Sequence, residues 1–107
     1  MATNIFSSIP AQLPDELCES LLNAKALRIE RIVSKGHCSP ADFWYDQTEN
    51  EWILLLQGAA QLGFADQSTI DLTPGDYLLI KAHCLHKVLW TVPDTETIWL
   101  AIHFNDD

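Results

Sequence analysis

The residues best suited to chemistry lie close together in the segment 73–90. His83, Cys84 and His86 fall within four positions, and imidazole and thiolate are common metal ligands. Alternate side chains of an extended chain share a face, so Cys84 and His86 would point to the same side. Val88 and Trp90 have the same parity, and these apolar companions indicate the core side of a strand. The cluster favours a ligand site, and a histidine simply buried in the core is the alternative interpretation.

Two short strands after a turn are expected to carry these side chains. The sequence TPGD at 73–76 is a strong turn signal, because proline presets the second position of a type II turn and glycine supplies the positive φ of the third. The apolar run at 77–80 predicts a buried strand, and a second extended run is expected at 84–91. His86 would lie on the inner side of that second strand.

This segment resembles the second sequence motif of the cupins, which reads glycine, five residues, Pro-x-Gly, two residues, histidine, three residues, asparagine. Gly75 and His86 match the first glycine and the histidine at the family's spacing. Lys81, His83 and Trp90 occupy the other three motif positions. The match is to a small single-domain cupin of the cupin-2 type.

The second half of the first cupin motif is also present. That motif reads His-x-His, three or four residues, glutamate, six residues, glycine, and Glu51 and Gly58 match its last two members. Counting back with the four-residue spacing places Trp44 and Asp46 at the two histidine positions, so the first motif is degenerate. The resemblance covers roughly residues 27 to 104 and implies a small cupin barrel.

The resemblance also implies a divalent metal inside the barrel, because the motif histidines and glutamate of cupins bind one. Glu51 and His86 are carried over as ligands. Asp46 stands at a ligand position, and His83 could supply a second imidazole. Imidazole and carboxylate ligands suit iron, manganese, nickel or zinc. The alternative for Glu51 is a solvated or ion-paired carboxylate.

Several side chains near the motifs are candidates for the wall of a pocket. Trp44 and Trp90 replace polar motif positions, and Cys84 has the same parity as His86. His103, in the last expected strand, would point either to the cavity or to water. Aromatic walls of this kind hold small molecules. The remaining aromatic residues of the chain either share that pocket or belong to the core.

The composition indicates which partners and which cellular compartment to expect. The chain has 107 residues, which fits one domain, and carries fifteen Asp and Glu against six Lys and Arg. Nucleic acid and anionic membranes are therefore not expected partners, since both need a basic surface. Three cysteines fit no disulfide or CxxC pattern, which favours the cytoplasm. The small size favours a homodimer, and cupins are commonly dimeric.

The expected architecture is all-β, a small jelly-roll-like antiparallel barrel. Residues 1–26 are expected to form an N-terminal arm and a short helix from Pro14 to Leu22, because proline suits the first helical turn. Residues 27–107 form the barrel, with strands expected at 27–34, 43–46, 51–57, 59–64, 68–72, 77–80, 84–91 and 96–104. Many short strands with turns between them are typical of closed antiparallel folds.

Three classes of function are compatible with this sequence. The first is a cupin that binds a divalent metal and a small molecule, with or without enzymatic activity. The second is a metal-free module that binds or senses a small molecule in an aromatic pocket. The third is a structural dimer whose barrel is filled by side chains. The chain has no Ser-His-Asp order and no glycine-rich phosphate loop, so hydrolase and kinase functions are not indicated.

Overall fold

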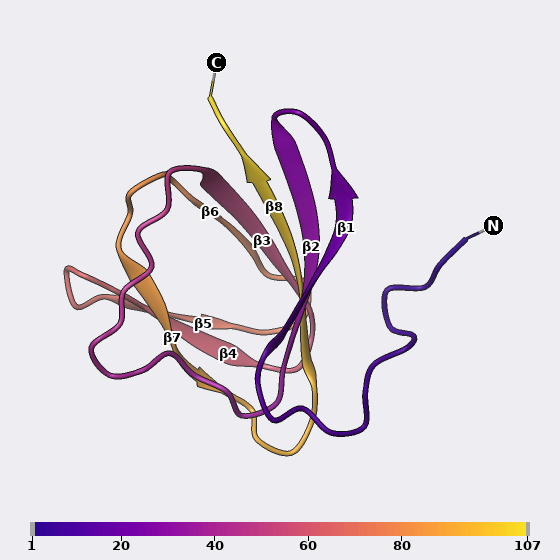
Figure 1. Cartoon of the computed structure of the whole chain (residues 1–107). Coiled ribbons are helices and arrows are strands. Elements are labelled where there is room, and N and C mark those ends of the chain that lie inside the picture. The colour runs from indigo at the N-terminus through magenta and orange to yellow at the C-terminus, as the bar shows by residue number, and fades with distance from the viewer. Residues whose placement is uncertain (1, 107) are drawn as a thin grey trace.

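The computed structural model describes residues 2–106 and contains eight strands in two antiparallel sheets (Figure 1). The strands are β1 (Leu17–Asn23), β2 (Leu27–Ser34), β3 (Asn50–Gln57), β4 (Ala60–Phe64), β5 (Thr69–Leu72), β6 (Tyr77–Ile80), β7 (His86–Thr91) and β8 (Thr97–Phe104). The predicted all-β antiparallel barrel is confirmed. Among the described residues, no helix is long and apolar enough to cross a membrane.

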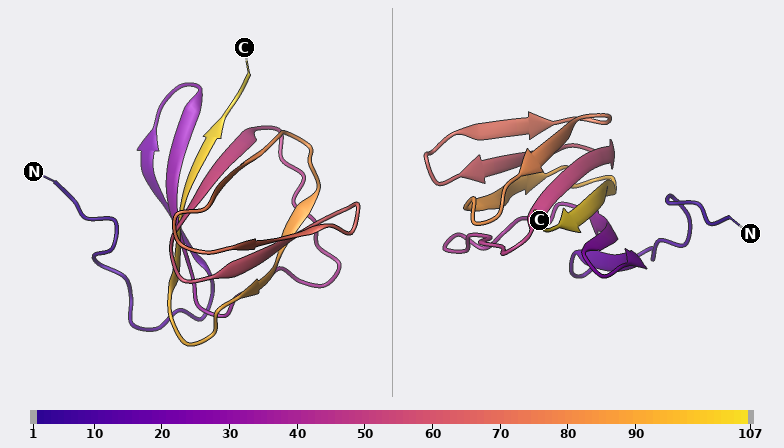
Figure 2. Two further views of the ribbon diagram at one scale, coloured as in Figure 1. Left: turned by 180° about the vertical axis from the view of Figure 1, so that it is seen from behind. Right: turned by 90° about the horizontal axis from the view of Figure 1, so that it is seen from above.

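The two sheets face each other and enclose the interior of the barrel (Figure 2). The larger sheet has the strand order β1-β2-β8-β3-β6, and the smaller has the order β5-β4-β7. In the large sheet, β3 lies between β8 and β6 and pairs with both. The strand β4 has the same role in the small sheet, between β5 and β7. Glu51 of β3 and His86 of β7 are therefore brought to opposite walls of one interior.

Alternation along the strands sends apolar side chains inward. In β3, Ile53 and Leu55 are buried, whereas Trp52 and Leu54 are only partly buried. Glu51 has the parity of the buried residues, so its carboxylate enters the interior with them. The apolar core that surrounds it consists of Ile53, Leu55, Ala60, Leu62, Leu72, Ile80, Trp99 and Ala101.

The short helix predicted from Pro14 to Leu22 is wrong. Residues Leu17–Asn23 form β1, which pairs antiparallel with β2 at the edge of the large sheet. A helix of so few residues is marginal in water, because nucleation is costly and little propagation follows. Pairing with β2 supplies backbone hydrogen bonds instead. This segment consequently belongs to the large sheet, and only the residues before it form an irregular arm.

The strand predicted at 43–46 is replaced by a single bridge. The backbone N–H of Tyr45 donates to the carbonyl of His86 at 2.7 Å, and the N–H of His86 donates back at 3.2 Å. The strand predicted from residue 84 begins at His86, because the preceding segment turns with His83 at a φ of 63°. The other predicted strands are present. The bridge holds the segment of the first motif against the histidine of the second.

A bulge in β7 changes which side chains face the interior. Leu62 of β4 lies opposite Val88, but the neighbouring Gln61 lies opposite Trp90, so Leu89 has no partner. An extra residue in one strand shifts the following side chains to the other face. Trp90 is accordingly 47% exposed. The prediction that Trp90 lines the pocket is therefore wrong.

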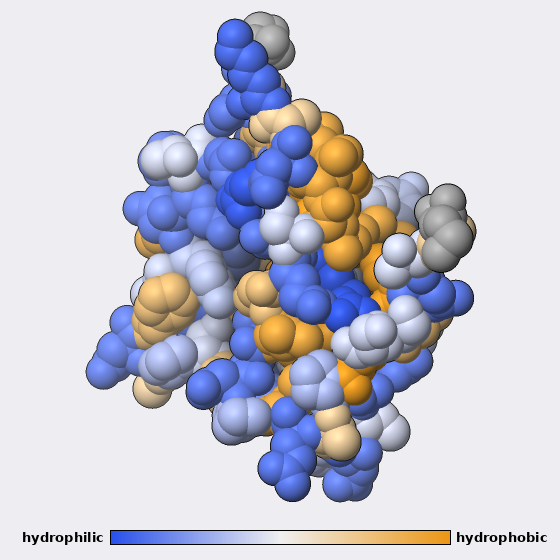
Figure 3. Space-filling view, turned by 45° about the vertical axis from the view of Figure 1, so that its right-hand side comes forward, coloured by the Kyte–Doolittle hydropathy of each residue, from blue (hydrophilic) through white to orange (hydrophobic). Residues whose placement is uncertain are grey.

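The outer face of the large sheet carries an apolar row across all five strands. Leu79, Trp52, Ile102, Ile29 and Leu22 lie opposite one another in register from β6 to β1. All five are exposed or half-buried. Figure 3 shows apolar side chains gathered among hydrophilic ones on the side of β1 and β2. Such a face suits a subunit contact, and the predicted homodimer stays a prediction.

Arg31 attaches the N-terminal arm to the outer face of the large sheet. Its guanidinium donates to the carbonyls of Ile5 and Ser7 at 3.0 and 2.6 Å and forms an ion pair with Glu19 of β1. The residue is only 5% exposed, so its charge is almost entirely covered. A buried guanidinium needs such acceptors. The arm is therefore part of the structure around β1 and β2.

Candidate functional site

A cavity of about 130 Å³ lies inside the barrel. Its ionisable lining consists of Glu16, Cys18, Glu30, Tyr45, Glu51, His86 and His103. Much of the remaining wall is apolar and is formed by Ile32, Ile53, Leu62, Ile80, Val88 and Trp99. A few polar groups on an apolar concave wall are the usual form of a small-molecule site.

His86 and Glu51 meet inside this cavity from opposite sheets. The Nε2 atom of His86 lies 3.6 Å from Oε1 of Glu51, and the two side chains are only 6% and 10% exposed. The Nδ1 atom of His86 lies 2.8 Å from the carbonyl oxygen of Cys84. Since a carbonyl only accepts, Nδ1 carries a proton and Nε2 is the atom presented to Glu51. The sequence prediction that these two motif residues come together agrees with this geometry.

The environment of His86 acts on its pKa in opposite directions. Burial, the largest single effect, lowers the pKa of the imidazole, because the charged form loses hydration. The negatively charged Glu51 carboxylate at 3.6 Å and the hydrogen bond to the Cys84 carbonyl together outweigh it. The pKa of His86 is therefore raised above its ordinary value of 6.5. A histidine tuned in this way can hold or release a proton near neutral pH.

His103 extends the pair into a chain of four groups. Its Nε2 atom lies 3.1 Å from Oε1 of Glu30 and 4.0 Å from Oε2 of Glu51. The imidazole is buried, and its Nδ1 has no hydrogen-bond partner among the described residues. The order is thus Glu30, His103, Glu51, His86. Sequence reasoning left the direction of His103 open, and it missed Glu30 because β2 carries no family motif.

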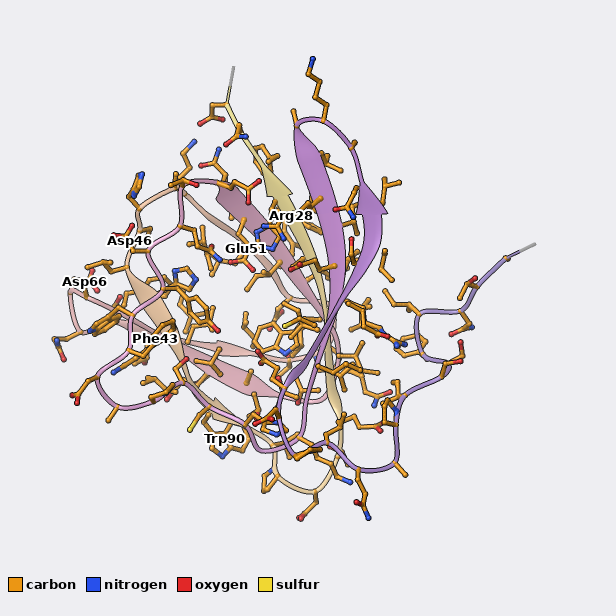
Figure 4. All side chains as sticks on the ribbon, viewed as in Figure 1. Arg28, Phe43, Asp46, Glu51, Asp66 and Trp90 are labelled. Atoms are coloured by element: carbon orange, nitrogen blue, oxygen red, sulfur yellow. The ribbon has the colours of Figure 1, made fainter. Side chains whose placement is uncertain are left out.

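The other two predicted metal ligands, Asp46 and His83, lie outside the cavity. They contact each other, with Nδ1 of His83 2.8 Å from Oδ1 of Asp46, and their side chains are 55% and 65% exposed. His83 has the left-handed φ of 63°, at the position where the motif has a glycine. The turn therefore directs its imidazole outward. Figure 4 shows Glu51 between the sheets and Asp46 and Trp90 at the periphery.

Tyr45 and Gln47 line the cavity where Trp44 and Asp46 were expected. They correspond to the three-residue spacing that the first motif also allows, and choosing that spacing would have found them. The ring of Tyr45 stacks on His86 with centroids 5.3 Å apart. Trp44 instead lies beside Lys87, whose Nζ is 4.5 Å from the ring centroid. Trp44 is not among the residues that line the cavity.

The remaining predicted pocket residue, Cys84, acts through its backbone. Its side chain is half-buried and packs against the apolar core rather than lining the cavity. Its carbonyl orients His86, as described above. The prediction that the Cys84 side chain lines the pocket is therefore wrong, because the strand begins two residues later than expected and the parity argument does not reach back to it.

A different cysteine, Cys18 of β1, lines the cavity. Although the residue is exposed at the edge of the cavity, loss of hydration by neighbouring atoms, followed by the negative charges of Glu16, Glu30 and Glu51, raises the pKa of its thiol from 9.0 to about 11. The thiol therefore stays protonated at neutral pH and acts as a weak donor rather than as a nucleophile. Sequence reasoning missed Cys18 because it placed this segment in a helix outside the barrel.

Comparison with solved structures identifies the fold family. A protein from Ralstonia eutropha JMP134, named a "putative mannose-6-phosphate isomerase", is 40% identical to this chain, with 99% of each chain covered and a TM-score of 0.94. A cupin superfamily protein from Desulfitobacterium hafniense DCB-2 is 25% identical, covers 92% of this chain and 84% of its own, and has a TM-score of 0.74. The chain belongs to the cupin superfamily.

A more distant solved structure shares only the fold with this chain. An RmlC-like cupin protein from Desulfovibrio desulfuricans has a TM-score of 0.74 over 96% of this cupin and 95% of its own chain, at 15% identity. No family model matches the sequence, and no curated protein matches it. The family resemblance that Gly58, Gly75, Glu51 and His86 indicated is therefore confirmed by structure rather than by sequence profiles.

The side chains of this cupin do not fit the divalent metal that the family motifs imply. Within residues 2–106, no three histidine, cysteine, aspartate or glutamate side chains are grouped so that they could hold an ion. Tyr45 and Gln47 occupy the motif's histidine positions, and Asp46 and His83 lie outside. A catalytic metal needs three protein ligands. Glu30, Glu51, His86 and His103 line the same cavity, but no three of these side chains are grouped so that they could hold an ion.

Proposed function

We propose that this cupin binds a small polar molecule inside the barrel without a metal, and that His86 and Glu51 exchange a proton with it. The observation that carries this proposal is the pair itself: an imidazole and a carboxylate 3.6 Å apart in a cavity wall, each nine-tenths covered. The cavity volume of about 130 Å³ is below the roughly 300–1,000 Å³ of sites for drug-sized ligands, which points to a small molecule.

The fixed ring orientation supports a role in proton transfer. Because the Cys84 carbonyl holds Nδ1, only Nε2 of His86 can gain or lose a proton toward the cavity. The raised pKa leaves part of the population protonated near neutral pH, so His86 can act as an acid. Glu51 can then accept a proton or hold a donor of the bound molecule. Tyr45 adds a phenol whose pKa is raised by burial and nearby negative groups, so it stays a donor.

The cavity of this cupin does not favour a sugar phosphate such as the one in the name of the Ralstonia eutropha protein. A sugar phosphate needs cationic side chains or a cradle of backbone N–H groups around its dianion. Among the described residues, none of those that line the cavity is lysine or arginine. Three of them are glutamates. The charge of this cavity therefore favours a ligand without phosphate.

The experiment separates the three classes of function. Protein treated with chelator is titrated with iron(II), manganese, nickel and zinc by calorimetry and screened by ligand-observed NMR against small polar molecules. We expect no stoichiometric metal uptake and at least one bound molecule, whose binding is lost in His86→Gln and kept in His83→Asn. Stoichiometric metal that disappears in His86→Gln would establish the metal-binding alternative instead. No metal and no bound molecule would favour the structural dimer.

A further inference from the structure

The charge of the cavity wall points to the chemical class of its ligand. Glu16, Glu30 and Glu51 line it together with His86 and His103. Even if both imidazoles were protonated, three carboxylates against two imidazolium ions would leave a net charge of −1 in the ionised site. An excess of one sign in a low-dielectric wall attracts the opposite charge and repels its own.

The arginine that contacts a glutamate of the wall does not reverse this balance. Arg28 pairs with Glu30 at 2.8 Å, but its other nitrogen is 2.7 Å from Glu49. Counting Arg28 and Glu49 adds one positive and one negative charge, so the local sum is unchanged. Figure 4 shows Arg28 and Glu51 in the upper part of the molecule, and the strand register places His103 of β8 between them. The acidic character of the cavity therefore persists when its immediate surroundings are included.

Glu51 is the carboxylate that lacks a close partner. It is 7% exposed, yet its nearest imidazole nitrogens lie at 3.6 and 4.0 Å, which is longer than a hydrogen bond. By contrast, Glu30 is held by Arg28 at 2.8 Å, and Glu16 accepts from Ser34 at 2.8 Å. A buried carboxylate normally has its hydrogen bonds satisfied. Glu51 thus has capacity for a donor that the described part of the chain does not supply.

Aromatic rings complete the surroundings of such a donor. Tyr45 and Trp99 both line the cavity, and Tyr45 stacks against His86. Faces of tyrosine and tryptophan attract cations through the ring quadrupole. An ammonium group received by a carboxylate is stabilised further by aromatic rings in the same cavity wall. Neutral polyols and anions gain less from the same wall.

We infer that the ligand of this cavity is a small organic ammonium compound whose cationic group is received by Glu51. This inference rests on the proposed function, since it names the ligand of the same site, and it goes beyond it by fixing the sign of the ligand's charge. A matched series of ethanolamine, ethylene glycol and glycolate tests this inference. The three compounds share a hydroxyl group and a two-carbon frame and differ in charge.

The three probes are titrated at millimolar concentrations into chelator-treated wild-type protein, with binding followed by the chemical shifts of backbone amides in β3 and β7. We expect ethanolamine to bind at least tenfold more tightly than ethylene glycol and glycolate not to bind detectably. In Glu51→Gln, which is nearly isosteric, we expect the ethanolamine affinity to fall at least fivefold and the ethylene glycol affinity to change less than twofold. Asp46→Asn removes the same charge outside the cavity and should change neither.

The outcomes distinguish this inference from the proposed function. Equal binding of ethanolamine and ethylene glycol would overturn the charge preference and leave a polar-molecule site in place. Tighter binding of glycolate would overturn it as well. Failure of all three probes to bind would also overturn it, and the metal titration and broader screen would then decide the proposed function separately. If Glu51→Gln does not fold, the ranking of the three probes on the wild type still gives the answer.

Discussion

Two imidazole–carboxylate pairs, His86–Glu51 and His83–Asp46, differ mainly in their surroundings. His86 and Glu51 are 3.6 Å apart with side chains 6% and 10% exposed. His83 and Asp46 are closer, at 2.8 Å, but their side chains are 65% and 55% exposed. In water the interaction of two charges is screened, whereas in a protein wall it is several times stronger. The longer contact is therefore the one with chemical consequences.

The largest expected effect comes from breaking the buried pair. His86→Ala removes a covered side chain and leaves Glu51 without its imidazole, so the free energy of unfolding should fall by about 3 kcal/mol. His83→Asn, whose side chain tolerates a left-handed backbone, should cost less than about 1 kcal/mol. Urea denaturation of both variants measures the difference. Equal losses would show that the two pairs are energetically alike.

A second contrast between cavity and surface concerns the cysteines. Cys18 and Cys38 are both exposed, but only Cys18 lies beside the cavity glutamates that help to raise its thiol pKa to about 11. The smaller thiolate fraction, partly offset by the greater nucleophilicity of a more basic thiol, should slow alkylation of Cys18 by about tenfold relative to an ordinary thiol. Mass spectrometry after iodoacetamide treatment at pH 8 gives the two rates. In denaturant the rates should converge, and a native Cys18 that reacts as fast as Cys38 would contradict the cavity electrostatics.

The buried pair should also make stability depend on pH. The pKa of His86 is higher in the folded protein than its ordinary value of 6.5, so the folded state binds this proton more tightly than the unfolded chain. The stabilisation is complete below about pH 6.5 and is lost as the pH rises through the folded-state pKa. Denaturation of the wild type between pH 6 and 9 should show this loss, and His86→Gln should lack that component. A His86-dependent increase in the free energy of unfolding from pH 6 to 9 would contradict a raised pKa of His86.

The smallest expected effect is the coupling within the surface pair. A double-mutant cycle of His83→Asn and Asp46→Asn should give an interaction energy below about 1 kcal/mol that decreases with added salt. The short contact of 2.8 Å does not alter this expectation, because both side chains are more than half exposed. A coupling energy comparable to the loss in His86→Ala would remove the distinction between the two pairs.

The sequence was informative where local chemistry decides the structure. Period-two alternation puts Glu51 on the face of Ile53 and Leu55, and this face is buried in β3. The turn predicted at 73–76 is present, with Gly75 at a φ of 95°. Sequence-based prediction failed where pairing between distant segments determines the structure. The bulge opposite Gln61 and the pairing of β1 with β2 depend on neighbouring strands, so parity sent Trp90 inward and local signals made a helix of β1.

The candidate site was predictable only through its motif residues. Glu51 and His86 could be found because their spacing to Gly58 and Gly75 follows the family pattern. Glu30 and Cys18 lie on β2 and β1, which reach the cavity through sheet pairing and carry no spacing signal. Side chains that converge from unmarked strands can be recognised only once the register is known.

The ring nitrogens of His86 test the central claim most directly. Nitrogen-15 NMR of chelator-treated protein, with the His86 signals assigned by comparison with His86→Gln, should show Nδ1 protonated throughout and Nε2 titrating with a midpoint above 6.5. Addition of equimolar zinc should leave both signals unchanged. A Nε2 signal that moves to a metal-bound position on addition of zinc, or a proton that leaves from Nδ1 instead, would contradict a metal-free site in which His86 exchanges its proton with the cavity.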